Sequence, residues 1–477
     1  MSEHMLTLIP DERLGPISPR IFGVLVEPYG RTIDGVWVGK KSSIPNDNGL
    51  RLDTIKAFRQ LRTPIIRWPG GTVADTYHWE DGIGPSSKRP RTWNYFFGGE
   101  ESNEFGTDEF LRFCEAVGAE AWIKINALTT SLGDTVKWMQ YCNYGGNTHL
   151  SNLRRQNGHP NPYGVKYWSI GNETSPAFSP EGYAERVHEW SYYMRPADRH
   201  SRIVVSGEAK GNWNERFLAR YAELLQDTGA LTQLKDMFHV LAVKYANEKQ
   251  VRDAAELLDQ YLGPGTVEVC VEEWAAQSGS IPPWPQKLAE LSIWEAILEV
   301  SEMDLPYEGS VQMDAAVSAA ATLHGLIRNA DLVKLASFLY PVNTWGPLIK
   351  TDGPRFLRTA NYHVFDLLKQ HMGADSIGVE WDRTRGLDIV ASLSEDGRKT
   401  TVSIVNPKET DSTEVRLQIR GAEVRAATSV VLTGRPTDEN TFEAPGKIKP
   451  VPGKVNKRGE EWVALCPAYS LTVVTLD

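Results

Sequence analysis

Short apolar runs alternate with helix-like stretches along most of the chain, which predicts a series of strand–helix units. Such alternation is typical of a parallel sheet whose strands are connected by helices. Eight units at this spacing favour a closed (β/α)8 TIM barrel, an α/β fold. The expected strands are residues 21–27, 64–68, 121–126, 165–171, 203–207, 238–245, 266–273 and 335–342.

Two of the connecting stretches carry clear helix signals. Ser179, Pro180 and Glu181 read as a cap followed by proline in the first helical turn. Asp314 opens an alanine-rich run, 315–327, which predicts another helix packed on the barrel. The first of these helices has one apolar face, because large side chains recur at helical spacing at Tyr183, Val187, Trp190 and Met194.

The pattern changes to period two after about residue 372. Residues 402–404, 415–419 and 471–473 alternate apolar and polar positions between turn-forming residues. This favours a C-terminal antiparallel β-sandwich, to which the N-terminal run 5–9 adds a strand. We therefore expect a catalytic barrel over 16–370 and a second domain made of 1–15 with 371–477.

Composition narrows the class of protein. The chain has 477 residues, 41% hydrophobic and 23% charged, which is ordinary for a globular protein with a sizeable core. Its net charge of −10 argues against nucleic-acid and anionic-membrane partners. No cationic leader and no run of about 18 apolar residues is present in the sequence. Four scattered cysteines indicate reduced thiols, so we expect a cytoplasmic protein.

Two glutamates stand at the ends of two expected strands. Glu173 follows the strand 165–171 and Asn172, and the strand 266–273 ends in Glu272 and Glu273. Glycoside hydrolysis needs two carboxyl groups across one cleft, one to protonate the leaving oxygen and one to attack the sugar or activate water. Periodicity alone leaves open whether Glu272 or Glu273 points into the barrel.

Other polar residues also fall at the carboxyl ends of these strands, where barrels of this kind place their active sites. Arg67 has a definite electrostatic use, because a guanidinium beside a carboxylate favours its ionised form. The expected pocket thus combines Glu27, Arg67, Asn126, Asn172, Glu173, Tyr245, Glu273 and Tyr340.

Competing chemistries find little support. The ten histidines form no HxH, HExxH or HxxxH cluster, and no GxSxG elbow is present. We therefore expect no metal and no cofactor. A few of the fifteen tryptophans are expected to line a sugar cleft, because flat ring faces match the C–H faces of sugars.

Longer motifs resemble those of the α-L-arabinofuranosidases of glycoside hydrolase family 51. The resemblance runs over nearly the whole chain, and the segment Lys166–Trp168 with 171–173 is similar to the family's acid/base signature. Its other motifs here are residues 18–23, 26–27, 30–31, 37–39, 43–46, 67–71, 77–85, 89–92, 103–110 and 438–442.

This resemblance implies a barrel of the glycosidase clan A type with a jelly-roll-like sandwich, and a retaining exo-hydrolase of terminal arabinofuranosyl residues. It implies that Glu173 is the general acid/base and that Glu273, within the motif Glu272-Glu273-Trp274, is the nucleophile. Glu27, Arg67, Asn172 and Tyr245 match residues that hold the sugar or the nucleophile. The resemblance also implies an oligosaccharide substrate and a homo-oligomer, commonly a hexamer.

The chain departs from the family pattern around the expected pocket. Thr72 and Tyr340 stand at substrate-binding positions where the family has other residue types, and so do Pro28, Lys244 and Gln277. The alternatives are therefore a galactofuranosidase, a xylosidase or an endo-glucanase/xylanase. A non-catalytic carbohydrate-binding barrel is a more remote alternative.

Overall fold

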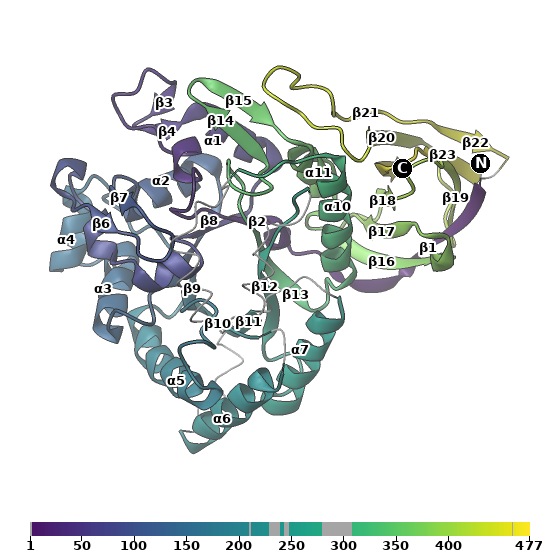
Figure 1. The fold of residues 1–477 in the computed structure, drawn as a ribbon. Coiled ribbons are helices and arrows are strands. Elements are labelled where there is room, and N and C mark those ends of the chain that lie inside the picture. The colour runs from purple at the N-terminus through teal and green to yellow at the C-terminus, as the bar shows by residue number, and fades with distance from the viewer. Residues whose placement is uncertain (1, 209–210, 229–238, 243–247, 279–307, 460) are drawn as a thin grey trace, which may run out of the picture.

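The computed structural model describes residues 2–208, 211–228, 239–242, 248–278, 308–459 and 461–477. Eight parallel strands close into a barrel in the order β10-β11-β12-β13-β2-β5-β8-β9. Helices surround this barrel, and a second sheet lies beside it (Figure 1). The barrel strands are β2 (Gly23–Leu25), β5 (Ile65–Trp68), β8 (Glu120–Ile125), β9 (Tyr167–Ile170), β10 (Arg202–Ser206), β11 (His239–Ala242), β12 (Glu268–Trp274) and β13 (Val333–Phe338).

Each of these strands falls on one of the eight predicted runs, so the barrel prediction is confirmed. The two predicted helices are present as α5 (Pro180–Ala197), capped by Ser179, and α10 (Met313–Arg328). The apolar face predicted for α5 is buried. The other α-helices in the part of the chain that the structure describes are α1 (Leu52–Leu61), α2 (Thr107–Val117), α3 (Leu132–Asn143), α4 (His149–Gln156), α6 (Trp213–Asp227), α7 (Glu248–Leu262) and α11 (Ala360–Leu368).

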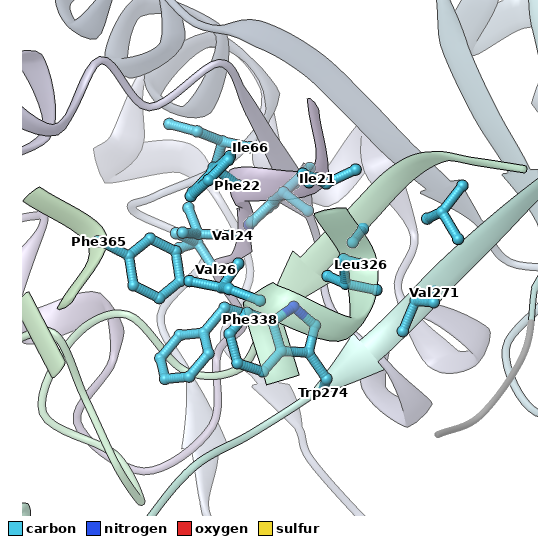
Figure 2. Close-up of a cluster of buried hydrophobic side chains, with 14 of the residues drawn as sticks. Ile21, Phe22, Val24, Val26, Ile66, Val271, Trp274, Leu326, Phe338 and Phe365 are labelled. Atoms are coloured by element: carbon cyan, nitrogen blue, oxygen red, sulfur yellow. The ribbon is translucent and has the colours of Figure 1, made fainter. Parts of the chain in front are cut away.

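The outer face of the barrel packs against the helices. Trp274 of β12 stacks on Phe365 of α11 at 5.8 Å between ring centroids and meets Phe338 of β13 edge-on (Figure 2). Burying a large apolar side chain of this kind stabilises the fold by about 1.5–3 kcal/mol. This shell fixes the barrel strands to the surrounding helices.

The barrel interior is layered, with an apolar floor and a polar layer above it. The floor is a closed cluster of six buried side chains: Ile65, Trp122, Tyr167, Val204, Cys270 and Leu335. Two residues further along each strand the side chain is polar, and these buried residues are Arg67, Lys124, Ser169, Ser206, Glu272 and Ser337. Since side chains alternate between faces, both layers point inward. The polar layer lies nearer the carboxyl ends of the strands.

The second sheet has ten strands in the order β21-β20-β24-β18-β17-β16-β1-β19-β23-β22. The N-terminal strand lies inside this sheet, as predicted, and the purple segment runs among green and yellow strands in Figure 1. The strands are β1 (Ser2–Pro16), β16 (Asp375–Trp381), β17 (Asp388–Leu393), β18 (Thr400–Asn406), β19 (Thr413–Ile419), β20 (Ala427–Thr433), β21 (Val451–Pro452), β22 (Val455–Arg458), β23 (Glu461–Cys466) and β24 (Ser470–Leu476).

One pairing in this sheet departs from the antiparallel prediction. β1 runs antiparallel to β16 but parallel to β19, so the sheet is mixed. The reason is that β1 comes from the other end of the chain rather than through a hairpin. The division into 16–370 and 1–15 with 371–477 stays a prediction. Short hairpins complete the described structure: β3 (Asn46–Asp47) with β4 (Leu50–Arg51), β6 (Thr92–Trp93) with β7 (Glu100–Glu101), and β14 (Ile349–Asp352) with β15 (Arg355–Arg358).

Two further sequence expectations have a counterpart in the structure. The four cysteines are buried free thiols. In the part of the chain that the structure describes, no helix is both long and apolar enough to cross a membrane.

Candidate active site

Arg67 is the centre of the polar layer. It is fully buried, and its Nη1 lies 2.9 Å from Glu273 Oε1. Nη2 donates to Asn172 Oδ1 at 2.8 Å and to the Gly70 carbonyl at 3.0 Å, while Nη1 donates to the Glu272 carbonyl at 2.9 Å. These contacts hold the guanidinium in one position, so it orients the carboxylate of Glu273.

Glu27 follows β2 and is buried beside this centre. Its Oε1 accepts from the main-chain N–H of Gly71 at 2.8 Å, and its Oε2 accepts from the Tyr340 hydroxyl at 2.5 Å. Burial raises the pKa of Glu27 to about 7. The Tyr340 and Gly71 hydrogen bonds and the Arg67 charge oppose this rise, and the negative charge of Glu273 adds to it.

Three predicted site residues converge over Gly71. A Cβ atom at Gly71 would lie 3.0 Å from Glu273 Oε1, 3.5 Å from Asn172 Nδ2 and 3.6 Å from Glu27 Oε1. Polar atoms from the ends of three different strands therefore surround one small space. Thr72 comes next and begins a 3-10 helix (Thr72–Thr76), where it is partly exposed beside this space.

A β-bulge decides the orientation of the two consecutive glutamates in β12. Val271 pairs with Ala336, but Trp274 pairs with Phe338, so β12 has one more residue than β13 between these pairs. The extra residue turns Trp274 to the outer shell and leaves both Glu272 and Glu273 facing the interior. Periodicity could not choose between the glutamates because both point inward.

The two glutamates then differ in their surroundings. Glu272 forms a buried ion pair with Lys124, and its Oε1 lies 4.0 Å from Arg67 Nη2. The side chain of Glu273 is 21% exposed, against 7% for Glu272. Glu272 is thus enclosed by cations within the polar layer, whereas Glu273 is partly exposed to solvent.

Glu173 lies where β9 turns into the following loop. Its φ of +40° and the φ of +70° at Gly171 place both residues in the left-handed region. Asp75 fixes this turn, because it accepts from the N–H of Asn172 at 2.9 Å and from the N–H of Ala127 at 3.0 Å. Burial raises the pKa of Glu273, and the charge of Glu173 adds to this rise, so the two carboxyl groups interact electrostatically.

Negative charge exceeds positive charge in this group of side chains. Glu27, Asp75, Glu173, Glu272 and Glu273 surround the two cations Arg67 and Lys124. Burial raises the pKa of Glu273 and raises that of Asp75 to about 6. Although burial acts in the same direction on Glu272, the two cations hold its pKa below the ordinary value. The arrangement therefore favours an ionised Glu272 beside a Glu27 that binds a proton more readily.

The structure thus brings together Glu27, Arg67, Asn172, Glu273 and Tyr340, with Thr72 and Glu173 next to them. Tyr245 and Lys244 lie outside the described residues. Asn126 instead braces the loops beside the site, since its amide oxygen accepts from the N–H groups of Leu128 and Thr129 and its Nδ2 donates to the Tyr77 carbonyl at 3.2 Å.

Sequence reasoning missed Lys124 and Asp75. A lysine at the inward position of an otherwise apolar strand was the available signal for Lys124. Asp75 carried no such signal, because its role depends on how two loops meet. Among the described residues, no group of three or more histidine, cysteine or acidic side chains is arranged to hold a metal ion.

Comparisons with known proteins agree with this geometry. A family model described as "Alpha-L-arabinofuranosidase 1 domain" matches residues 57–262, and one described as "Alpha-L-arabinofuranosidase C-terminal domain" matches residues 273–470. The chain is 30% identical over 461 residues to an alpha-L-arabinofuranosidase C of Emericella nidulans, covering 89% of this chain and 88% of that protein. The chain belongs to the α-L-arabinofuranosidase family, GH51.

Other members of the family match over nearly full length. An intracellular exo-alpha-L-arabinofuranosidase of Bacteroides ovatus is 28% identical over 509 residues, covering 99% of this chain and 95% of that protein. The GH51 arabinofuranosidase of Xanthomonas axonopodis pv. citri has a TM-score of 0.86 at 25% identity, with both chains fully covered. An arabinose complex of the Thermotoga maritima α-L-arabinofuranosidase has a TM-score of 0.85 at 26% identity, covering 99% of each chain. The family resemblance and the predicted fold class are confirmed.

Proposed function

We propose that this protein is a retaining exo-α-L-arabinofuranosidase that releases terminal arabinofuranosyl residues from oligosaccharides. Family membership supports the activity. The observation that carries the site assignment is the convergence of Glu273, Asn172 and Glu27 over Gly71, with Arg67 bonded to two of them. A carboxylate held by a buried guanidinium at the open side of a polar barrel end suits a nucleophile.

In the first step Glu273 attacks the anomeric carbon and the glycosidic bond breaks. Arg67 holds the Glu273 carboxylate in place, because three other hydrogen bonds fix the guanidinium. Its positive charge also offsets the negative charge of the carboxylate. Glu173 donates its proton to the departing oxygen, which leaves as a neutral hydroxyl. The product of this step is a sugar ester of Glu273 and a free leaving group.

In the second step Glu173, now ionised, takes a proton from water. The water oxygen attacks the anomeric carbon, and Glu273 leaves as a carboxylate. The proton taken from water returns Glu173 to its starting form. Two inversions return the sugar with its original configuration. This mechanism expects the two carboxyl groups to be about 5–5.5 Å apart.

In this proposal Glu27 and Tyr340 bind the hydroxyl groups of the sugar. Glu27 already accepts from three donors, Gly71, Val73 and Tyr340, and its pKa of about 7 lets it exchange a proton near neutral pH. Tyr340 stands where the family has another residue type, so we expect it to influence which furanose fits. Thr72 and Asn172 complete the pocket wall, and Tyr245 is retained as a substrate-binding residue.

The direct test is hydrolysis of 4-nitrophenyl α-L-arabinofuranoside beside the corresponding galactofuranoside, xyloside and β-glucan or xylan substrates. Arabinofuranoside turnover with the highest kcat/KM supports the proposal. Higher kcat/KM on another substrate identifies one of the alternatives. Ligand binding without any turnover, unchanged in Glu273→Gln, would identify a non-catalytic binding barrel.

The roles of the glutamates are tested with an exogenous nucleophile. In a Glu173→Ala variant, azide should restore turnover of a substrate whose leaving group needs no acid, giving a glycosyl azide of retained configuration. A folded variant that binds substrate but yields no such product would contradict the acid/base role.

The cellular location and the oligomeric state of the protein are also proposals. The Bacteroides ovatus relative is named as intracellular, and we propose a cytoplasmic location for this protein also. We further propose a homo-oligomer, with a hexamer as the expected assembly, and light scattering on the purified protein measures its size directly.

A further inference from the structure

Asp75 is a buried carboxylate beside the proposed catalytic centre, and the mechanism gives it no step. It is 2% exposed and lies in the 3-10 helix Thr72–Thr76, which follows β5. Both of its carboxyl oxygens accept hydrogen bonds from main-chain N–H groups. Since a buried charge is costly unless it is hydrogen-bonded, these bonds tie Asp75 to the two segments that donate them.

The two donors come from the ends of neighbouring barrel strands. Ala127 follows β8 and donates to Asp75 Oδ1 at 3.0 Å, while Asn172 follows β9 and donates to Asp75 Oδ2 at 2.9 Å. The Thr129 hydroxyl also donates to the main-chain carbonyl of Asp75, at 3.1 Å. Because β5, β8 and β9 are consecutive in the barrel, one residue joins the mouths of three strands.

The turn that carries Glu173 has a backbone conformation that its surroundings must hold. Glu173 has a φ of +40°, which residues with a side chain rarely adopt. Gly171 has a φ of +70°, and an added Cβ there would meet its nearest neighbour at 2.6 Å. The N–H of Asn172, between these two residues, is the one bonded to Asp75. This bond therefore helps to set the direction in which the Glu173 side chain leaves the turn.

The other end of the same short helix is tied to Glu27. The N–H groups of Gly71 and Val73 donate to Glu27 Oε1 at 2.8 and 3.4 Å. One helical turn thus separates the anchor of Glu27 from Asp75, which is the anchor of the Glu173 turn. The helix fixes the spacing between the carboxyl group that we assign to the sugar hydroxyls and the one that we assign to proton transfer.

The nucleophile depends on this anchor much less than the acid does. Asn172 reaches Glu273 only through Arg67, whose Nη2 donates to Asn172 Oδ1 at 2.8 Å. The guanidinium is also held by the main-chain carbonyls of Gly70 and Glu272 at 3.0 and 2.9 Å. A shift of the Asn172 peptide would therefore move Glu173 while these carbonyls keep Arg67 and the nucleophile in place.

We propose that Asp75 is a positioning residue for acid catalysis, which holds the Asn172 peptide so that the Glu173 carboxyl group reaches the departing oxygen. This inference rests on the proposed function, because it concerns how the acid of that same site is placed. It follows that Asp75 matters for leaving groups that need a proton, such as sugars and simple alcohols. A leaving group that departs as a stable anion makes no such demand.

The test compares two substrates that release the same sugar. Methyl α-L-arabinofuranoside has a leaving group that needs a proton, whereas 4-nitrophenolate leaves without one. The measured quantity is the ratio of their kcat/KM values, methyl over 4-nitrophenyl. In Asp75→Asn an amide N–H2 faces one of the two peptide donors, so that bond is lost. We expect this ratio to fall about thirtyfold, because a positioned acid contributes about 100–10,000-fold and a displaced one forfeits part of it.

A double-mutant cycle shows whether Asp75 acts through Glu173. It uses phenyl α-L-arabinofuranoside in place of the methyl glycoside, because a phenol leaves readily enough to be measured without the acid. Glu173→Ala should lower the ratio of phenyl to 4-nitrophenyl kcat/KM, and Asp75→Asn should lower it no further in that background. A second, independent fall in the double variant would overturn the proposed action through Glu173.

Asp134→Asn is the matched control. Asp134 also accepts from a main-chain N–H, that of Ser131 at 3.2 Å, but at the start of α3. This variant should keep the wild-type ratio, and thermal melting should show which variants are folded. Asp75→Ser, which keeps a single acceptor oxygen, decides the question if Asp75→Asn does not fold.

Each remaining outcome points to a different conclusion. An equal loss on both substrates in the folded Asp75 variants, or no loss at all, overturns the positioning role and leaves the proposed function intact. An unchanged ratio in Glu173→Ala itself overturns the acid/base assignment, and this inference falls with it. Failure of the wild-type protein to hydrolyse any of these arabinofuranosides overturns the proposed function.

Discussion

Tyr340 donates a hydrogen bond of 2.5 Å to Glu27 Oε2, while the N–H of Gly71 donates to the other carboxyl oxygen at 2.8 Å. Both donors stabilise the ionised form and oppose burial, which raises the pKa of Glu27 to about 7. The charge of Glu27 therefore changes near neutral pH, in the middle of the proposed pocket.

Removing this donor should move the pH profile. In Tyr340→Phe the ionised form of Glu27 loses one stabilising hydrogen bond, so its pKa rises further. We expect the acid limb of the kcat/KM profile to shift to higher pH, with about a tenfold loss at pH 7. Tyr362→Phe is a suitable control, because that buried hydroxyl contacts the Ala57 carbonyl on the outer helices. Superimposable acid limbs for Tyr340→Phe and wild type would contradict the role of this bond.

The adjacent glutamates of β12 should respond in opposite ways. Glu272→Gln leaves Lys124 buried without its charge partner, so we expect a loss of about 3–5 kcal/mol in the free energy of unfolding. Glu273→Gln removes a charge that burial and Glu173 together disfavour more than Arg67 favours it, so its stability should equal or exceed that of the wild type. Its kcat should fall by about a thousandfold or more, because the nucleophile is lost.

Denaturant unfolding and steady-state kinetics on the two variants measure both quantities. The pair forms an internal control, since each variant changes one carboxyl group to an amide in the same strand. A stable but inactive Glu272→Gln together with an unstable but active Glu273→Gln would reverse our assignment.

Space at Gly71 should matter for activity more than for folding. In Gly71→Ala the new Cβ would lie 3.0 Å from Glu273 Oε1, which must shift. Because a displacement of about 1 Å in a reacting group can cost about a hundredfold, we expect the smaller shift here to lower kcat/KM by about tenfold. Gly446→Ala provides the comparison, since its nearest neighbour would be 3.9 Å away. Full activity in Gly71→Ala would show that Glu273 and its neighbours tolerate the displacement.

Acid should destabilise the contact between α10 and the second sheet. His371 is fully buried between Ser392 and Ser403, at 2.7 and 2.9 Å, and Ser403 also contacts His324 at 2.8 Å. Burial lowers the pKa of His371 to about 3, and the charge of His324 adds to this. The folded state therefore binds this proton more weakly than the unfolded state does.

It follows that the contribution of neutral His371 to the free energy of unfolding is fully present above about pH 6.5 and is lost as the pH falls toward about 3. Within this window one such group costs about 1.4 kcal/mol per pH unit. Asp388, which faces His324 and Arg328, has a pKa lowered to about 2, and its contribution is lost below its ordinary pKa. His371→Gln should reduce the slope of unfolding free energy against pH by about one proton between pH 6.5 and 3. An unaltered slope would assign the acid sensitivity to other groups.

Much of the site could be predicted because strand ends are visible in the sequence. Glu27, Arg67 and Asn172 sit at the ends of strongly apolar runs, and parallel strands bring such ends to one edge of the barrel. The family motifs added the choice of Glu273. The structure supplies a reason for that choice, because Glu272 is enclosed by Lys124 and Arg67 whereas Glu273 is partly exposed.

Other features depend on contacts that no local pattern encodes. A bulge adds one residue to a strand without changing its composition, so the inward position of both Glu272 and Glu273 is invisible to periodicity. Asp75 and the β6–β7 hairpin lie outside the barrel strands, and their positions are set by hydrogen bonds to residues distant in the sequence. The parallel pairing of β1 with β19 is likewise set by the meeting of two chain ends.

The location of β1 has a consequence for synthesis of the protein. Leu6 pairs with Trp381 on one side and with Leu417 on the other, so β1 is synthesised long before either of its partner strands. Such distant pairing is slow to form and leaves both edges of β1 exposed until then. A chain whose translation stops before β16 carries an unpaired β1, which favours aggregation.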